Sequence, residues 1–234
     1  MLKGAKNLGM YKKIINNTKL VMSFSMLKIL GHEINKSNWN NDKKKLIWAI
    51  SCIAFFGSFR MGELLPKNYS DNNFEKLTWH DVNFRRDGSV LLNVKFPKHV
   101  KNSSGDFIDL FPIEGKKYCP VTLLKNLHKN TANIEANKPV FSYANGKTIT
   151  TGEFTSSVKS LLEPIFGDKI SNLSGHSFRA GVPAALSSCP DIATETDVSI
   201  WGRWSSSAYK AYTKLKQHAR QLIFNKILTA VYRC

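Results

Sequence analysis

Three short motifs in this 234-residue chain combine arginine, histidine and tyrosine side chains. Arg60 follows an apolar run and precedes Met-Gly-Glu-Leu-Leu, and the motif Gly-His-Ser-Phe-Arg holds His176 and Arg179. The motif Trp-Gly-Arg-Trp-Ser-Ser-Ser-Ala-Tyr-Lys-Ala-Tyr ends at Tyr212. A guanidinium is always charged and binds two phosphate oxygens with its planar fork, and an ionised tyrosine is a nucleophile. These residue types could cut a phosphodiester bond without a metal.

Other side chains in the same motifs could assist that reaction. His176 lies three residues before Arg179, so the two share one face of a helix. A free imidazole titrates near pH 6.5, so it could donate to the phosphate or help to deprotonate the tyrosine. Trp204 can donate its indole N–H but cannot titrate. Tyr209 stands three residues before Tyr212 and is the competing nucleophile.

The charge of the chain indicates a polyanionic partner. The formal net charge is +17, no acidic residue precedes Glu33, and none follows Asp197. A strongly basic chain with an ordinary apolar content of 42% is typical of a globular nucleic-acid-binding protein. A membrane surface is the rival partner, but the sequence has no long apolar span and no lipid anchor.

No motif for a metal or a nucleotide cofactor is present. The sequence lacks H-E-x-x-H and Walker A motifs, and its four cysteines are far apart. We therefore expect no metal and no cofactor, and free thiols in a reducing compartment.

The periodicity predicts a mainly helical, α+β fold with one small sheet. Apolar and capping patterns predict helices at 46–56, 119–129, 151–165 and 215–231. Runs rich in β-branched and aromatic residues, separated by turn signals, predict three antiparallel strands at 77–82, 89–96 and 107–111. A helix should begin at Ser174 or Gly175, with a kink or a break at Pro183.

The order Arg, His-x-x-Arg, Trp, Tyr resembles the tyrosine recombinase (phage integrase) family. The motif Trp-Gly-Arg-Trp-Ser-Ser-x-Ala-Tyr-x-x-Tyr is similar to its mobile-element branch, the DIRS-type retroelements and Cryptons. Gly-x-x-Arg-x-x-Glu-Leu resembles the first arginine box of the family, in which Glu63 would orient Arg60. The resemblance implies a helical catalytic domain with one small three-stranded antiparallel sheet.

The resemblance also implies a role for each site residue. Tyr212 would attack the phosphate to give a 3′-phosphotyrosine. A lysine on the sheet's hairpin would protonate the 5′ oxygen; Lys98 matches that position best, with Lys95 and Lys101 as rivals. The scissile phosphate would be held by Arg60, His176, Arg179 and Trp204.

The resemblance further predicts how the chain is organised and what it acts on. We expect a junction or helical segment at 1–42 and the catalytic domain at 43–234, without the upstream core-binding domain that is usual in the family. The expected partner is double-stranded DNA, in a homotetramer, for recombination or integration of a mobile element, in the nucleus if the host is eukaryotic. The C-terminal helix could dock on a neighbouring subunit or pack on its own core. A catalytically inert, domesticated DNA-binding protein is the alternative function, and an RNA-binding protein is a third hypothesis.

Overall fold

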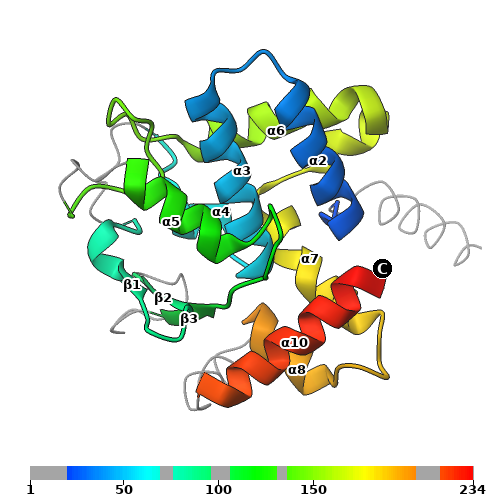
Figure 1. The fold of residues 1–234 in the computed structure, drawn as a ribbon. Coiled ribbons are helices and arrows are strands. Elements are labelled where there is room, and N and C mark those ends of the chain that lie inside the picture. Colours follow the sequence, from blue (N-terminus) through cyan, green and yellow to red (C-terminus); the bar gives the residue numbers. More distant parts are fainter. Residues whose placement is uncertain (1–19, 69–75, 96–105, 131–135, 204–216, 234) are drawn as a thin grey trace, which may run out of the picture.

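A computed structural model of the chain describes residues 20–68, 76–95, 106–130, 136–203 and 217–233. The described residues form a mainly helical fold with one three-stranded antiparallel sheet, which confirms the predicted fold class (Figure 1). The helices are α2 (Phe24–Lys36), α3 (Asn41–Phe56), α4 (Met61–Leu64), α5 (Pro120–Asn130), α6 (Thr151–Phe166), α7 (Gly175–Ser187), α8 (Glu195–Gly202) and α10 (Gln217–Arg233). No helix in these ranges is long and apolar enough to cross a membrane.

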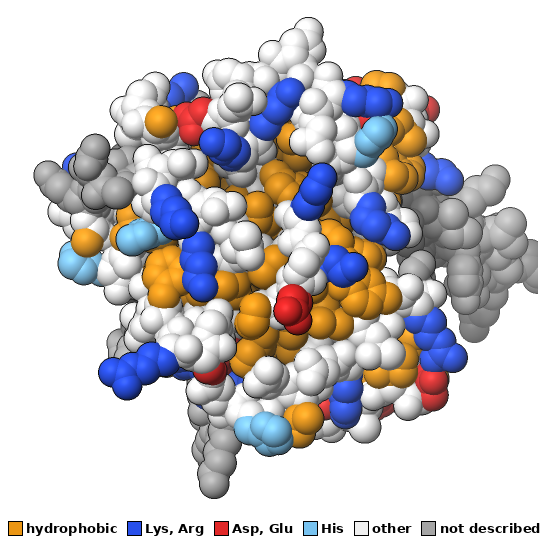
Figure 2. Space-filling model, viewed as in Figure 1, with side chains coloured by type: hydrophobic (Ala, Val, Ile, Leu, Met, Phe, Trp, Pro, Cys, Tyr) orange, Lys and Arg blue, Asp and Glu red, His pale blue; other side chains and the backbone are white. Residues whose placement is uncertain are grey.

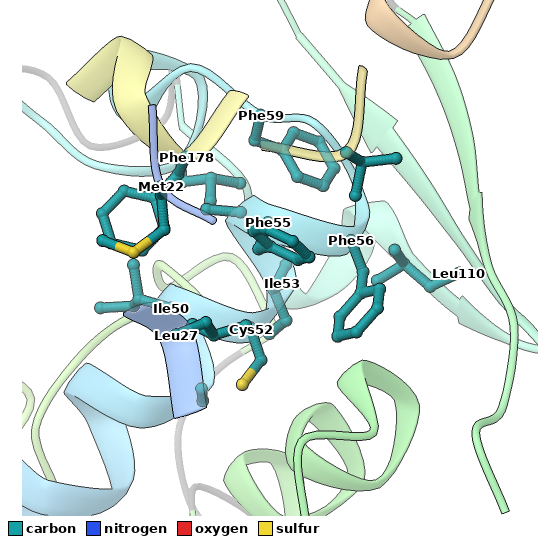
Figure 3. Packing of buried hydrophobic residues seen from close by; sticks show 14 of the residues in the cluster. Met22, Leu27, Ile50, Cys52, Ile53, Phe55, Phe56, Phe59, Leu110 and Phe178 are labelled. Carbon is teal, nitrogen blue, oxygen red and sulfur yellow. The ribbon is translucent and has the colours of Figure 1, made fainter. Parts of the chain in front are cut away.

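Helix α3 forms the centre of the hydrophobic core. It contacts α2, α5, α6 and α7, so every residue from Ile53 to Phe56 is buried. Asn40 caps its first turn by accepting from the Lys43 amide at 2.8 Å. The helix ends at Gly57, and Phe55, Phe56 and Phe59 lie together at this end (Figure 3). The predicted helix at 46–56 therefore forms and begins five residues earlier, at Asn41.

The sheet has the order β1-β2-β3, with β1 at Val82–Phe84, β2 at Val90–Val94 and β3 at Asp106–Leu110. Val90, Leu92 and Val94 point into the core, as the alternation of period two requires. The prediction for the first strand was wrong, because Trp79–Asp81 forms a 3₁₀ turn and the strand begins at Val82. The Asp81 carboxylate accepts from both the amide and the hydroxyl of Thr78, which closes the chain into that turn.

Helix α7 runs through Pro183 and continues to Ser187, so the chain does not break at the proline. Proline at this position removes one backbone hydrogen bond, the one that would reach the Arg179 carbonyl. Packing offsets that loss, because Phe178, Val182 and Leu186 are fully buried along the same helix. Ser174 caps the helix, as predicted, by accepting from the His176 amide at 3.3 Å.

Helix α10 packs on its own domain, which is one of the two positions that its amphipathic pattern allows. Ile223, Phe224 and Ile227 are buried against the core, and α10 contacts α7. At its other face, Lys226 forms an ion pair of 2.7 Å with Asp197. The helix lies beside α8 at the bottom of the molecule in Figure 1.

Candidate active site

The turn after α3 positions Arg60. Ser58 adopts a left-handed conformation, with φ of 48°, which reverses the chain after the buried helix. Arg60 then caps the short helix α4, and its amide donates to the Glu63 carboxylate at 2.8 Å. Its guanidinium lies 3.4 Å from the other oxygen of Glu63, and its side chain keeps 22% of its surface exposed. Glu63 thus orients Arg60 through both its backbone and its side chain.

Arg179 reaches the same carboxylate from the first turns of α7. Its side chain is only 5% exposed, and its Nη1 atom lies 3.6 Å from Glu63 Oε1. The Nη2 atom donates to the carbonyls of Gly202 and Arg203, at 2.6 and 2.8 Å. This fork fixes the end of α8 against α7.

Arg203 is a third arginine at this point, and no role was predicted for it. Its Nη2 atom lies 3.0 Å from Glu63 and donates to the Ser58 carbonyl at 2.8 Å. The guanidinium carbon lies 5.2 Å from the centre of the Phe59 ring, within the range of a cation–π interaction. The residue ends α8 with φ of 51°, a left-handed conformation that turns the chain away from the helix axis.

These contacts place three guanidinium groups around one buried carboxylate. Burial acts to raise the pKa of Glu63, but the charges of Arg203 and Arg179 outweigh it and lower that pKa below its ordinary value. The carboxylate is therefore ionised at neutral pH and balances one of the three positive charges. The remaining excess of positive charge, partly shielded from water, is suited to binding an anion such as a phosphodiester.

Comparisons with known proteins support the fold. No protein-family model and no curated protein matches the sequence. Among solved structures, the chain resembles the XerH site-specific recombinase bound to its difH substrate in a pre-cleavage complex, with a TM-score of 0.55 and 16% identity. The match covers 87% of this chain and 53% of that chain, so this chain spans about half the length of the solved structure. This is the fold of a tyrosine recombinase catalytic domain.

Within the tyrosine recombinase fold, some predicted site residues belong to the described part of the chain and the others lie outside it. Arg60 and Arg179 come together around Glu63, although they are distant in sequence. His176 lies in the first turn of α7, on its exposed side. The other predicted residues lie outside the described part of the chain: Lys98, Trp204 and Tyr212, with the rivals Lys101 and Tyr209.

The three candidate lysines all lie between β2 and β3 in the sequence. Lys98 belongs in sequence to the connection between β2 and β3, as expected for a hairpin of this sheet. Lys95 directly follows β2, and its amine forms an ion pair of 2.8 Å with the buried Asp81. That ion pair holds Lys95 at the 3₁₀ turn and makes it a weaker candidate for a proton donor.

Trp201 stands three residues before Trp204 in the motif that ends at Tyr212. Trp201 is buried, and its indole N–H donates to the Phe56 carbonyl at 3.0 Å, so it is a core residue. Among the described residues, no group of three or more His, Cys, Asp or Glu side chains could hold a metal ion.

Proposed function

We propose that this chain cuts and rejoins DNA strands through a covalent 3′-phosphotyrosine. The observation that carries the proposal is the cluster of Arg60, Arg179 and Arg203 around Glu63. It lies where the three sequence motifs converge, in a fold shared with a site-specific recombinase. Such a cluster stabilises the charge that develops on the oxygens of a phosphate under attack.

Each step of the reaction has a proposed residue. Arg60, His176, Arg179 and Trp204 hold the scissile phosphate, while Glu63 and Arg203 position the two other arginines. The Tyr212 hydroxyl gives its proton to His176, and its oxygen forms a bond to phosphorus as the bond from phosphorus to the 5′ oxygen breaks. Lys98 gives a proton to that leaving oxygen. The phosphotyrosine keeps the energy of the broken bond, so the free 5′ hydroxyl rejoins the strand by the reverse reaction without ATP.

The biological setting is part of the same proposal. We place the chain in the tyrosine recombinase family, in its DIRS-type and Crypton branch, where it recombines or integrates the DNA of a mobile element. Its partner is double-stranded DNA, bound by a homotetramer, in the nucleus if the host is eukaryotic. Residues 43–234 form the catalytic domain and residues 1–42 the segment that leads into it. The branch assignment rests on the motif that ends at Tyr212, and the partner, the tetramer and the domain bounds rest on the resemblance to the family.

The direct test is DNA relaxation without metal or ATP. The purified chain is incubated with supercoiled plasmid in EDTA, quenched with SDS, and assayed for relaxed DNA and for protein-linked DNA. We expect both products with the wild type and with Tyr209→Phe, and neither with Tyr212→Phe, because phenylalanine cannot form the phosphoester.

The controls separate chemistry from binding. Tyr212→Phe should bind the plasmid as tightly as the wild type, since the arginine cluster is intact. Loss of activity only in Tyr209→Phe would move the nucleophile to that residue. A chain that binds DNA but relaxes none of it, also when extended upstream, would favour the inert DNA-binding protein.

A further inference from the structure

A basic groove lies between α2, α3 and α5, away from the arginine cluster. It encloses about 1090 Å³ and is lined by residues of these helices and of the loop before α5. In Figure 1 these helices face the viewer, and in Figure 2 blue Lys and Arg side chains surround an apolar hollow over them. Nothing in the proposed reaction uses this surface.

The charge of the groove is of one sign. Six lysines line it and no aspartate or glutamate does: Lys28, Lys44, Lys45, Lys116, Lys117 and Lys129. None of the six forms an ion pair with a carboxylate of the described residues. Glu114 lies in the loop before α5, next to Gly115, but it is not among the lining residues. Six ammonium groups without carboxylate partners complement a polyanion.

The lining of the groove also holds aromatic side chains. Trp48 and Tyr118 line it together with Leu123. A Cβ atom on Gly31 would lie 2.8 Å from the Trp48 ring, so the glycine lets the indole lie close against α2. The indole N–H donates to the Lys117 carbonyl at 3.0 Å and fixes the loop that carries two of the lysines. This hydrogen bond thus holds the Trp48 indole next to the loop that carries Lys116 and Lys117.

The groove is separate from the site of the proposed cleavage. Trp48 lies eight residues before Phe56, the last residue of α3, which is about 12 Å at the rise of a helix, and Arg60 follows after that end. Neither Arg60 nor Glu63 lines the groove. Helix α10 of a second copy is also a poor occupant, because no acidic residue occurs in Gln217–Arg233.

We propose that this groove binds a single-stranded segment of nucleic acid. Phosphates would contact the lysines, and an unpaired base would stack on Trp48. The Tyr118 ring packs against Phe24 and Phe56 and supports this wall of the groove. A DNA duplex could bind the groove only through the charge of the lysines, because its bases are already stacked on one another. An apolar, aromatic lining therefore favours a single strand, and strand binding here does not depend on the proposed cleavage chemistry.

The test compares two triple variants of equal charge. Lys28, Lys117 and Lys129 are replaced by alanine in one; Lys36, Lys125 and Lys169, which do not line the groove, are replaced in the other. Binding of (dT)20 and of a 20-bp duplex is measured by fluorescence anisotropy between 50 and 300 mM salt. The groove variant should bind (dT)20 about tenfold or more weakly than the control variant, with a salt slope smaller by about 2.

Trp48→Leu tests the stacking contribution at constant charge. It should weaken (dT)20 binding about tenfold and duplex binding little, with an unchanged salt slope. Thermal unfolding followed by circular dichroism checks that each variant is folded. Quenching of the tryptophan fluorescence by (dT)20, present in the wild type and reduced in Trp48→Leu, gives a second readout that folding alone would not change.

Three results would overturn the proposal. Equal weakening by both triple variants would mean that (dT)20 binds through diffuse charge. A groove variant that weakens only duplex binding would make the groove a duplex contact. Displacement by poly-glutamate, with no effect of the groove variant on (dT)20, would indicate an acidic protein partner. Each measurement is made with Tyr212→Phe as the background as well, so a failure of cleavage leaves the result unaffected.

Discussion

Glu63 is the residue on which the geometry of the arginine cluster depends. Its carboxylate accepts a hydrogen bond from the Arg60 amide and lies within 3.6 Å of three guanidinium groups. A carboxylate with this many cationic neighbours holds arginines that would otherwise repel one another. It also sets how much positive charge remains for a phosphate, because it neutralises one of three charges.

Replacing this carboxylate should make stability depend on pH in a defined way. Glu63→Gln keeps the shape but removes the charge, which leaves buried arginines unpaired, and we expect it to destabilise the fold by about 3 kcal/mol at pH 7. Because the pKa of Glu63 is lowered by folding, its stabilisation is fully present above the unfolded value near 4.3 and is lost as the pH falls through the folded pKa. The difference between wild type and variant should therefore shrink below about pH 4.

Urea unfolding at pH 3 to 7 measures this difference. The exposed Glu163→Gln serves as the control, and it should unfold like the wild type at every pH. A Glu63→Gln protein as stable as the wild type at pH 7 would show that the carboxylate does not hold the cluster together.

The motifs predicted Arg60 and Arg179, because arginine next to an apolar run or within His-x-x-Arg is a recognisable pattern. Arg203 was missed, although it belongs to a quoted motif. Its contact with Glu63 requires the left-handed turn at the end of α8, and no periodicity or spacing indicates that conformation for an arginine.

Among the elements, α10 is tied to the rest of the fold by ion pairs of different burial. Near its start, Arg220 pairs with Asp109, which has no exposed side-chain surface and also binds Arg85 at 2.5 Å. At its end, Arg233 pairs with Asp191 on the solvent-exposed surface at 2.5 Å. The same helix therefore offers a buried and an exposed ion pair for comparison.

The two pairs should respond very differently to removal. Asp109→Ala should cost about 3 to 5 kcal/mol of unfolding free energy, because it leaves two partly buried arginines without their carboxylate. Arg233→Ala should cause no measurable change, since exposed pairs are screened by solvent. The melting temperatures of both variants and of the wild type are measured by thermal unfolding and compared. Similar melting temperatures for the two variants would contradict it.

The helices were predicted well because period and caps act locally. Thr150 caps α6 by accepting from the Glu153 amide at 3.1 Å, and Ser174 caps α7, as the sequence indicates. The misplaced first strand and the unbroken helix at Pro183 have different causes. The hydrogen bonds between Asp81 and Thr78, three residues apart, form a local capping pattern that the strand prediction overlooked. Burial of α7 against α3 keeps the helix unbroken, and this is a tertiary contact that a local pattern does not contain.

At the scale of the whole molecule, we expect charge rather than shape to dominate the approach to the proposed DNA partner. A net charge of +17 on 234 residues gives a long-range attraction for any polyanion. Much of this charge lies on lysines far from the arginine cluster, so binding and cleavage should be separable. Phosphate contacts of this kind position a protein without reading base sequence.

Duplex binding should therefore depend strongly on salt. With six or more phosphate contacts, we expect affinity for a random 20-bp duplex to fall about a thousandfold or more between 50 and 200 mM salt. Glu63→Gln, measured in parallel, should keep the same slope, because it alters no surface lysine. Fluorescence anisotropy gives both values. An affinity that changes less than about tenfold over this range would mean that few phosphates are contacted.

The hydrogen bond from Arg203 to the Ser58 carbonyl also bears on how the protein is made. It joins residues 145 positions apart. Ribosomes add roughly 5–20 residues per second, so Arg60 leaves the ribosome several seconds to half a minute before Arg203 does. During that interval the growing chain has no complete arginine cluster, and α10 is made after Arg203. A chain that stops before Arg203 therefore lacks the complete cluster that we propose holds a DNA phosphate. If the proposed function holds, strand cleavage has to wait until this late part of the chain has been made.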